Sequence, residues 1–342
     1  MSSARVTGTP AERVEGEEAI VQEYLAPLAK GLPGALGLSD DCAVLTPPPG
    51  ADLVLKTDPI IAGVHFLADD APGDIAWKAL AVNVSDLAAK AAEPVAYLMT
   101  LALPEAPARA WLRAFADGLA EAQAAFGCVL AGGDTDRTPG PLTIGITVIG
   151  TVPTASMIRR GTVRPGDMLY VSGTLGDAAL GLELRLGRVA PGSWGESARE
   201  QQALLTRYLR PQPRLGLRAA LRAEAHAAMD LSDGLAKDLG RMCRASGTGA
   251  VVETARVPQS SGFAKALARE PARIGALLAA GDDYEVLAAV PAARAEAFEA
   301  AAVAGGVPVT AIGTVVAGSG TRFLDADGRE IAIGRPGWDH FA

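Results

Sequence analysis

Apolar side chains in the first half of the chain switch between helical and extended spacing. Ile20, Tyr24 and Leu28 recur at intervals of four, which predicts an amphipathic helix. The polar residues 1–16 before this helix are expected to be disordered. The run PPPG at residues 47–50 favours a turn between two extended segments. The spacing predicts strands at residues 43–46, 52–61, 95–103, 128–130 and 142–152, and helices at residues 74–92 and 109–126.

Short apolar runs also alternate with polar turns in the second half. The segment GTLG at residues 173–176 leads into a helix whose N-terminus can receive an anion. The apolar run at residues 227–229 ends in DLSDG, and a helix is expected directly after it at residues 235–246. A loop is expected at residues 188–199, and strands at residues 168–172, 250–257, 284–290 and 309–315.

This alternation of strands and helices indicates an α+β or α/β fold in which helices cover the faces of sheets. The apolar pattern is interrupted around Pro153, where small polar residues cluster. We therefore expect an N-terminal domain at residues 17–152 and a C-terminal α/β domain at residues 153–342.

Charge and composition narrow the range of partners. The 342 residues carry a formal net charge of −8, which argues against nucleic acid as a ligand. Arg159, Arg160 and Arg164 lie close together and would suit one small anionic ligand. No apolar run reaches the ~18 residues that a membrane span needs, and no signal-peptide core is visible. We therefore expect a soluble, cytoplasmic protein with no membrane or nucleic-acid partner.

Acidic motifs mark the ends of several apolar segments. Any one of them fits an ordinary turn or helix cap, where Asp, Ser and Gly are favoured. Asp86 does not, because it lies inside an apolar helix, where an unpaired carboxylate is costly. Convergence on a shared Mg²⁺, which prefers carboxylate oxygens, explains the set better. The motifs are Asp40-Asp41, Thr57-Asp58, NVSD at residues 83–86, GGDT at residues 132–135 and DLSDG at residues 230–234.

The common nucleotide cradles do not occur in this sequence. There is no P-loop, no G-x-G-x-x-G after a strand, and neither the H-R-D nor the D-F-G of protein kinases. Converging Asp side chains would repel a triphosphate unless several Mg²⁺ ions neutralised them. The sequence therefore indicates a nucleotide that is bound through metal bridges.

A series of motifs resembles those of the thiamine-monophosphate kinase family. The match runs in order from about residue 18 to the end, although single motifs also occur in aminoimidazole ribonucleotide synthetase and selenophosphate synthetase. His65-Phe66 and the terminal GWDHF point to the thiamine-phosphate member. The motifs are GLSDDCA (37–43), TDPIIAGVHF (57–66), NVSDLAAKAAEP (83–94), GGDT (132–135), RPGD (164–167), DLSDGL (230–235), GDDYE (281–285) and GWDHF (337–341).

The resemblance implies a two-domain PurM-like fold and a phosphoryl-transfer reaction. The N-terminal halves of two subunits would form a joint β-barrel, which implies a homodimer, and ATP with Mg²⁺ would lie between the two domains. The γ-phosphoryl group of ATP would pass directly to thiamine monophosphate and give thiamine diphosphate. Because the acceptor is already an ionised phosphate, no strong general base is required.

The resemblance also implies three sets of site residues, carried over position by position. Asp58, Asp86, Asp134 and Asp233 are expected to be catalytic. Nucleotide contacts are matched by Gly133, Asp134, Arg159 and Ser232. Contacts to thiamine phosphate are matched by His65, Asp282 and Trp338. The metal-ligand positions are matched by Asp40, Lys56, Thr57, Asp58, Asp86, Asp134, Asp230 and Asp233.

Some residues depart from the family pattern or have an ordinary structural explanation. Lys56 stands where an oxygen donor is common, and an ammonium cannot coordinate Mg²⁺. Asp282 replaces the usual Glu and is one methylene shorter. From the residues alone, His65 could close a strand end, Trp338 could pack the chain's tail, and Arg159 could be a surface charge.

Two other functions remain open from the sequence. An ATP-dependent synthetase of the same superfamily would need a catalytic cysteine or selenocysteine in a glycine-rich N-terminal segment, and residues 1–16 contain neither. A nucleotide-binding scaffold without turnover is disfavoured by the retained Asp positions, although Lys56 keeps this alternative open.

Overall fold

The computed structural model describes residues 13–334 and 337–338. The predicted disorder of residues 1–16 therefore falls mostly outside the described residues, as does part of the terminal GWDHF motif. The chain divides into two compact units. Unit 1 comprises Met1–Leu87 and Glu93–Ala155, and unit 2 comprises Ala88–Ala92 and Ser156–Ala342.

The first helical segment is irregular. The α-helical turn α1 (Glu17–Ile20) continues as a π-helical turn (Val21–Leu25) and a 3₁₀ turn (Ala26–Ala29), so the predicted helix is confirmed but not as one regular α-helix. The predicted strand at residues 43–46 is wrong. That segment has no regular structure, and its Val44 N–H donates to the carbonyl of Gly34, in the 3₁₀ segment Pro33–Leu38, instead of to a strand.

Unit 1 contains one sheet in the order β1-β4-β2-β3. The β2–β3 pair is parallel and the other two pairs are antiparallel. Side chains of β4 alternate strictly between buried and partly buried, as a strand packed on one face requires. The strands are β1 (Ala51–Ile61), β2 (Glu93–Leu103), β3 (Val129–Arg137) and β4 (Thr143–Pro153). β3 is longer than predicted, so GGDT lies inside the strand.

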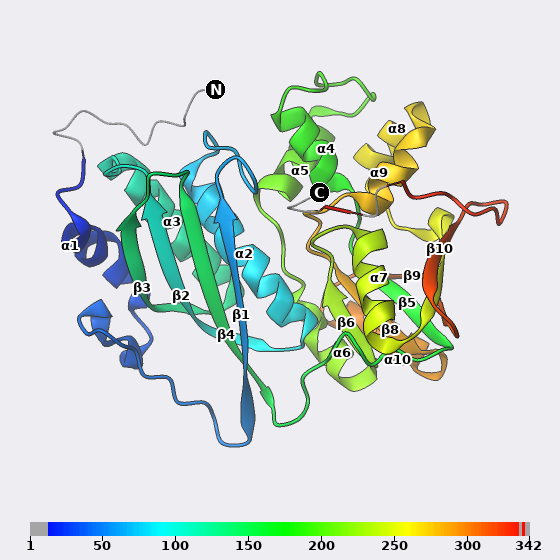
Figure 1. Cartoon of the computed structure of the whole chain (residues 1–342), viewed down its shortest axis with the longest axis horizontal. Helices are drawn as coiled ribbons and strands as arrows, with labels where there is room; N and C mark the ends of the chain where they lie inside the picture. Colours follow the sequence, from blue (N-terminus) through cyan, green and yellow to red (C-terminus); the bar gives the residue numbers. More distant parts are fainter. Residues whose placement is uncertain (1–12, 335–336, 339–342) are drawn as a thin grey trace. The chain divides into compact units, whose positions relative to one another are not determined.

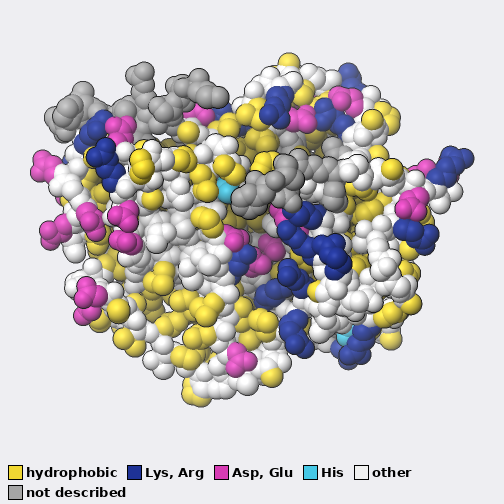
Figure 2. All heavy atoms as spheres, viewed as in Figure 1, with side chains coloured by type: hydrophobic (Ala, Val, Ile, Leu, Met, Phe, Trp, Pro, Cys, Tyr) yellow, Lys and Arg dark blue, Asp and Glu magenta, His cyan; other side chains and the backbone are white. Residues whose placement is uncertain are grey.

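Two long helices, α2 (Pro72–Ala89) and α3 (Arg109–Phe126), run along this sheet (Figure 1). Gln123 of α3 ties the helix to two strands, because its side-chain oxygen accepts from the Tyr97 hydroxyl of β2 and from the Leu130 N–H of β3. The opposite face exposes Leu53, Leu55 and Leu98. Figure 2 shows hydrophobic side chains gathered at the surface over β1 and β4.

Unit 2 is built on a mixed sheet in the order β10-β7-β9-β5-β8-β6. The four strands predicted from the sequence correspond to β5, β7, β8 and β9, whereas the two edge strands, β6 and β10, were not predicted as strands. β7 and β10 are parallel, and the other neighbours are antiparallel. The strands are β5 (Asp167–Ser172), β6 (Ala227–Asp230), β7 (Gly249–Glu253), β8 (Val286–Pro291), β9 (Val309–Val316) and β10 (Gly320–Leu324).

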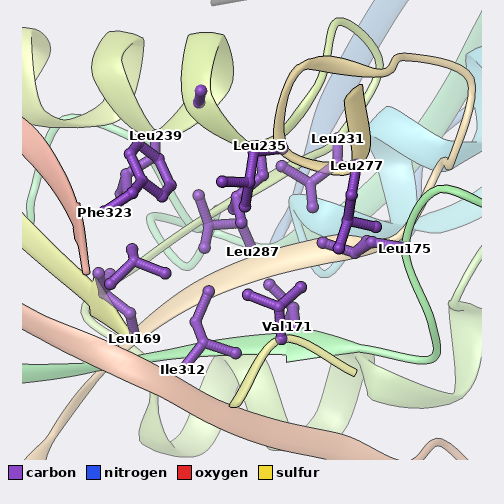
Figure 3. Close-up of a cluster of buried hydrophobic side chains, with 14 of the residues drawn as sticks. Leu169, Val171, Leu175, Leu231, Leu235, Leu239, Leu277, Leu287, Ile312 and Phe323 are labelled. Carbon is purple, nitrogen blue, oxygen red and sulfur yellow. The ribbon is translucent and has the colours of Figure 1, made fainter. Parts of the chain in front are cut away.

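Helices cover both faces of this sheet, which explains why its central strands read as continuous apolar runs. Leu169 and Val171 of β5 pack with Leu239 of α7 in one cluster (Figure 3). Tyr170 points to the other face, where its ring lies 5.1 Å from that of Phe298. The helices are α4 (Asp177–Arg185), α5 (Ala198–Leu209), α6 (Arg218–Glu224), α7 (Leu235–Ser246), α8 (Ser261–Arg269), α9 (Ile274–Ala279) and α10 (Ala295–Ala304).

The predicted α+β class is therefore confirmed, with a four-stranded sheet in unit 1 and a six-stranded sheet in unit 2. Across the part of the chain that the structure describes, no helix combines the length and the apolar character needed to cross a membrane.

Candidate functional site

Unit 1 holds a lysine between two carboxylates. The Lys56 ammonium lies 2.9 Å from a carboxylate oxygen of Asp58 and 2.8 Å from one of Asp86. Strand alternation places Lys56 and Asp58 on the same face of β1, and Asp86 reaches them from α2. The three side chains keep 30%, 50% and 25% of their surface exposed, in the order Lys56, Asp58, Asp86.

The side chain of Asn83 holds the backbone of Asp58, one of the two carboxylate residues, in place. Its side-chain oxygen accepts from the Asp58 N–H at 2.8 Å, and its amide nitrogen donates to the Asp58 carbonyl at 3.3 Å. Because β1 is an edge strand, these two backbone groups lack a neighbouring strand, and the amide takes its place. Asn83 is completely buried and lies three residues before Asp86, on the same side of α2.

The charges around Asp58 and Asp86 are those expected of two carboxylates that share one cation. Burial lowers the pKa of Lys56, but the stronger combined effect of Asp86 and Asp58 raises it above the ordinary lysine value, so the side chain is an ammonium at neutral pH. Two carboxylate oxygens thus converge on one positive atom, as they would on Mg²⁺. Among the described residues, no group of three His, Cys, Asp or Glu side chains lies close enough to hold a metal ion.

Other predicted residues of unit 1 do not join this pair. Thr57 lies on the opposite face of β1, where its hydroxyl accepts from Thr147 at 2.9 Å. Asp134 lies on β3, at the other edge of the sheet from β1, and accepts the Thr135 N–H. Gly133 is required for packing, because a Cβ there would lie 1.8 Å from the Met99 carbonyl oxygen.

The two remaining predicted residues of unit 1 lie in turns. His65 follows β1, and its Nδ1 accepts the Ile61 N–H at 3.0 Å, which places the proton of a neutral ring on Nε2. The imidazole is therefore held in one orientation by the end of the strand. Asp40 is exposed in a bend after the 3₁₀ segment Pro33–Leu38.

Unit 2 organises the DLSDG motif around a buried carboxylate. Asp230 is the last residue of β6, and the turn after it leads into α7. Asp238, in the first turns of α7, accepts the N–H groups of Ser232 at 3.1 Å and of Asp233 at 2.9 Å. Asp238 is fully buried, and burial raises its pKa to about 6. The DLSDG turn is thus held in shape by a side chain of α7, the helix that follows it.

Two cations of α7 face Asp233. Arg241 forms ion pairs with Asp233 and, at 2.8 Å, with Asp238, while the Lys237 ammonium lies 3.5 Å from Asp233. Lys and Arg side chains gather at the surface over this helix (Figure 2). Arg159 is exposed, and its carbonyl accepts from the Thr162 hydroxyl. This region of unit 2 is consequently rich in positive charge.

Two further segments meet the DLSDG turn. Asp282, in the left-handed region at φ 68°, donates its N–H to the Ser232 carbonyl at 2.9 Å. The Trp338 N–H donates to the Asp233 carbonyl at 3.1 Å, and the indole remains 48% exposed. A Cβ at Gly337 would lie 2.3 Å from that same carbonyl, so only glycine allows this approach. Unit 2 therefore brings Ser232, Asp233, Asp282 and Trp338 together.

Comparison with known proteins identifies the family. Models of the AIR synthase related protein match residues 39–152 with the N-terminal domain and residues 164–325 with the C-terminal domain. The thiamine-monophosphate kinase of Caulobacter vibrioides is 43% identical over 323 residues, which cover 94% of this chain and 89% of that protein. The chain belongs to the thiamine-monophosphate kinase family.

Solved structures of the thiamine-monophosphate kinase family agree with this assignment. The enzyme from Stenotrophomonas maltophilia superposes with a TM-score of 0.78 at 38% identity, covering 86% of this chain and 91% of that chain. A second structure, described as AaThiL complexed with AMPPCP and TMP, has a TM-score of 0.75 at 30% identity and covers 95% and 97% of the two chains. The resemblance drawn from the motifs is therefore confirmed.

Sequence reasoning missed the residues that support the predicted site residues in units 1 and 2. Asn83 was part of the NVSD motif, and its spacing of three from Asp86 was the available signal. Asp238 carried a similar signal, because it follows Asp233 by five residues at the start of a helix. Glu285 of GDDYE is buried and accepts from Arg207, Arg214 and Ser172, which anchors the loop that bears Asp282. No spacing in the sequence pointed to those two arginines.

Proposed function

We propose that this protein transfers the γ-phosphoryl group of ATP to thiamine monophosphate and so forms thiamine diphosphate. The observation that carries the proposal is family membership over nearly the whole chain, 94% of it in one alignment. Because ATP is the phosphoryl donor, we expect the reaction to take place in the cytoplasm.

Asp58 and Asp86 are the residues best arranged to hold Mg²⁺ in unit 1. Their oxygens already converge on a cation, and Asn83 holds the backbone of Asp58 in place. A bound Mg²⁺ would neutralise phosphate charge. We propose Asp40, Asp134, Asp230 and Asp233 as further ligands, and Gly133, Arg159 and Ser232 as nucleotide contacts. Thr57 can contribute only through its backbone, because its hydroxyl lies on the other face of β1.

The chain's own groups would position and orient the acceptor. An exposed indole such as that of Trp338 can stack on the cationic thiazolium ring. Asp282 projects from a strained backbone position next to Ser232, and His65 presents Nε2–H as a donor. Because the attacking phosphate is already ionised, these residues need to align it and exclude water, and none needs to remove a proton.

The proposal extends to assembly and domain roles. Leu53, Leu55 and Leu98 are exposed on the sheet face of unit 1 that the helices do not cover, and a second copy packing there would bury them. We propose that residues 17–152 form the domain for dimerisation and for ATP and Mg²⁺, and that the barrel is shared between two subunits. Residues 153–342 would form the second, α/β domain.

A direct transfer assay tests the activity. The purified full chain is incubated with γ-labelled ATP, Mg²⁺ and one acceptor at a time, and the labelled product is separated by chromatography. We expect label in thiamine diphosphate with thiamine monophosphate as acceptor, and none with thiamine, aminoimidazole precursors or selenide. Transfer to one of the other acceptors, or no transfer at all, would refute the proposal.

A further inference from the structure

Lys56 occupies the position that a metal ion would take between Asp58 and Asp86. We propose that this lysine is a built-in counter-ion, which holds the two carboxylates together without metal and competes with free divalent cations for them. The inference rests on the proposed function only for the identity of the metal. It concerns metal binding itself, and it can be tested without any turnover.

The geometry supports competition because one atom contacts both acids. The Lys56 ammonium lies 2.9 Å from Asp58 and 2.8 Å from Asp86, so both carboxylates point at one position. A cation that bridged the same two oxygens would have to share or replace that position. An ammonium has no lone pair for a metal, so Lys56 can only oppose the ion or move aside.

The charges support the same conclusion. Two aspartates with one lysine carry a net charge of −1, whereas the aspartates alone carry −2. Lys56 and Asp86 keep only 30% and 25% of their side-chain surface exposed, so water screens this interaction incompletely. Removal of the ammonium should therefore increase the attraction for a divalent ion.

The supporting residues allow the lysine to move without loss of the site. Asn83 holds the Asp58 backbone through two hydrogen bonds, and Asp86 lies one turn further along the same helix. The backbone segments that carry the carboxylates are thus positioned by β1 and α2, independently of the lysine side chain. Lys56 reaches them on a flexible four-carbon stem, which can swing away as a metal enters.

The test is a Mn²⁺ titration of the nucleotide-free, full-length protein, followed by electron paramagnetic resonance of the free ion. Lys56→Met removes the charge and keeps most of the stem, while Lys56→Arg keeps the charge. Lys265→Met is the matched control, because Lys265 also pairs with a carboxylate, that of Glu200 at 2.7 Å, in unit 2. We expect Lys56→Met to bind Mn²⁺ at least tenfold more tightly, and Lys56→Arg and Lys265→Met to match the unaltered protein.

Thermal unfolding in the presence of a chelator provides the second measurement. Lys56→Met should melt at a lower temperature than the unaltered protein, since two carboxylates then face each other alone, and added Mg²⁺ should restore the loss. Unchanged Mn²⁺ affinity in Lys56→Met would overturn the inference, as would weaker binding. A protein that shows the tenfold change but no phosphoryl transfer would refute the proposed function and leave this inference intact.

Discussion

At the scale of single residues, the site depends on backbone groups held by a few side chains. Asn83 takes the place of a neighbouring strand for Asp58, and Asp238 holds the turn that carries Ser232 and Asp233. Trp338 differs, because its backbone is fixed on Asp233 while its indole is left exposed. The contacts made by each residue therefore separate those that support the candidate site from those that we propose to bind a ligand.

Asn83→Ala should weaken both the fold and the activity. The partly buried Asp58 N–H and carbonyl would lose their side-chain partner, and a buried group left unsatisfied costs about 1–3 kcal/mol. Urea unfolding of the variant should show that loss, and kcat should fall because Asp58 is less well positioned. Gln202→Ala, at an exposed site on α5, is the control that should change neither quantity. Unaltered stability in Asn83→Ala would mean that the edge of β1 does not depend on this amide.

Trp338→Ala should affect one substrate and not the other. Stacking of an indole on a cationic ring is worth roughly 1–2 kcal/mol when desolvated, which corresponds to about a tenfold weaker binding of thiamine monophosphate. Affinity for ATP should hardly change, and Trp338→Phe should retain part of the effect. Titration calorimetry with each ligand measures both. Equal losses for both ligands would show that Trp338 only anchors the chain, and no loss for either would remove it from the site.

At the scale of elements, α5 shows how local sequence defines a helix start. Ser197 accepts the Glu200 N–H, and Glu200 accepts the Ser197 N–H at 2.7 Å, which is a complete capping box. Lys265 of α8 adds an ion pair to Glu200 at 2.7 Å, so the same carboxylate also joins two helices of unit 2. Lys265 and then Ser197 lower the pKa of Glu200 to about 2.

Ser197→Ala should lower the free energy of unfolding, measured in urea titrations, by about 1 kcal/mol, the usual value of such a cap.

Glu200→Gln should lower the free energy of unfolding in a pH-dependent way. A carboxylate with a depressed folded-state pKa stabilises the protein above its ordinary pKa of 4.5, and this contribution disappears as the pH falls toward about 2. The difference between Glu200→Gln and the unaltered protein should therefore be full at pH 6 and smaller at pH 3.5 in urea titrations. A difference that stays constant over this range would contradict the ion pair.

At the scale of the whole molecule, we propose that the uncovered face of the unit 1 sheet mediates assembly. Two of its strands, β1 and β2, expose large apolar side chains, with Leu55 65% and Leu98 39% exposed. A single chain in water gains nothing from this arrangement, whereas a second copy would remove that surface from solvent.

Leu55→Glu should convert the proposed dimer into a monomer. A charge in the centre of an apolar interface would be buried without a partner, so association should be lost at micromolar concentration. Light scattering should give twice the 34.9 kDa chain mass for the unaltered protein and the single mass for the variant. Val303→Glu is the control, since Val303 is an apolar residue that is even more exposed, at 74%, but lies on α10 of unit 2. A fully active monomer of the unaltered chain would refute the shared barrel.

The sequence by itself determined the family, the α+β class and most of the strands. Motifs such as DLSDG and GGDT are short, local and ordered along the chain, so they can be recognised without any contact being known. Strands β5, β8 and β9 were also visible, because a sheet covered on both faces leaves continuous apolar runs. The exposed segment at residues 43–46 was mistaken for a strand, since its apolar residues do not pack in the core.

Tertiary structure alone decided which of the predicted residues come together. Thr57 and Asp58 are adjacent in sequence but lie on opposite faces of β1, because side chains alternate along a strand. Lys56 reads in the sequence as a failed metal ligand, and only the fold shows its ammonium between Asp58 and Asp86. Asp86 of α2 meets Lys56 of β1, and Asn83 of α2 meets the Asp58 backbone although the two residues lie 25 positions apart along the chain. Such contacts depend on how β1 packs against α2, and no local pattern of residues encodes that packing.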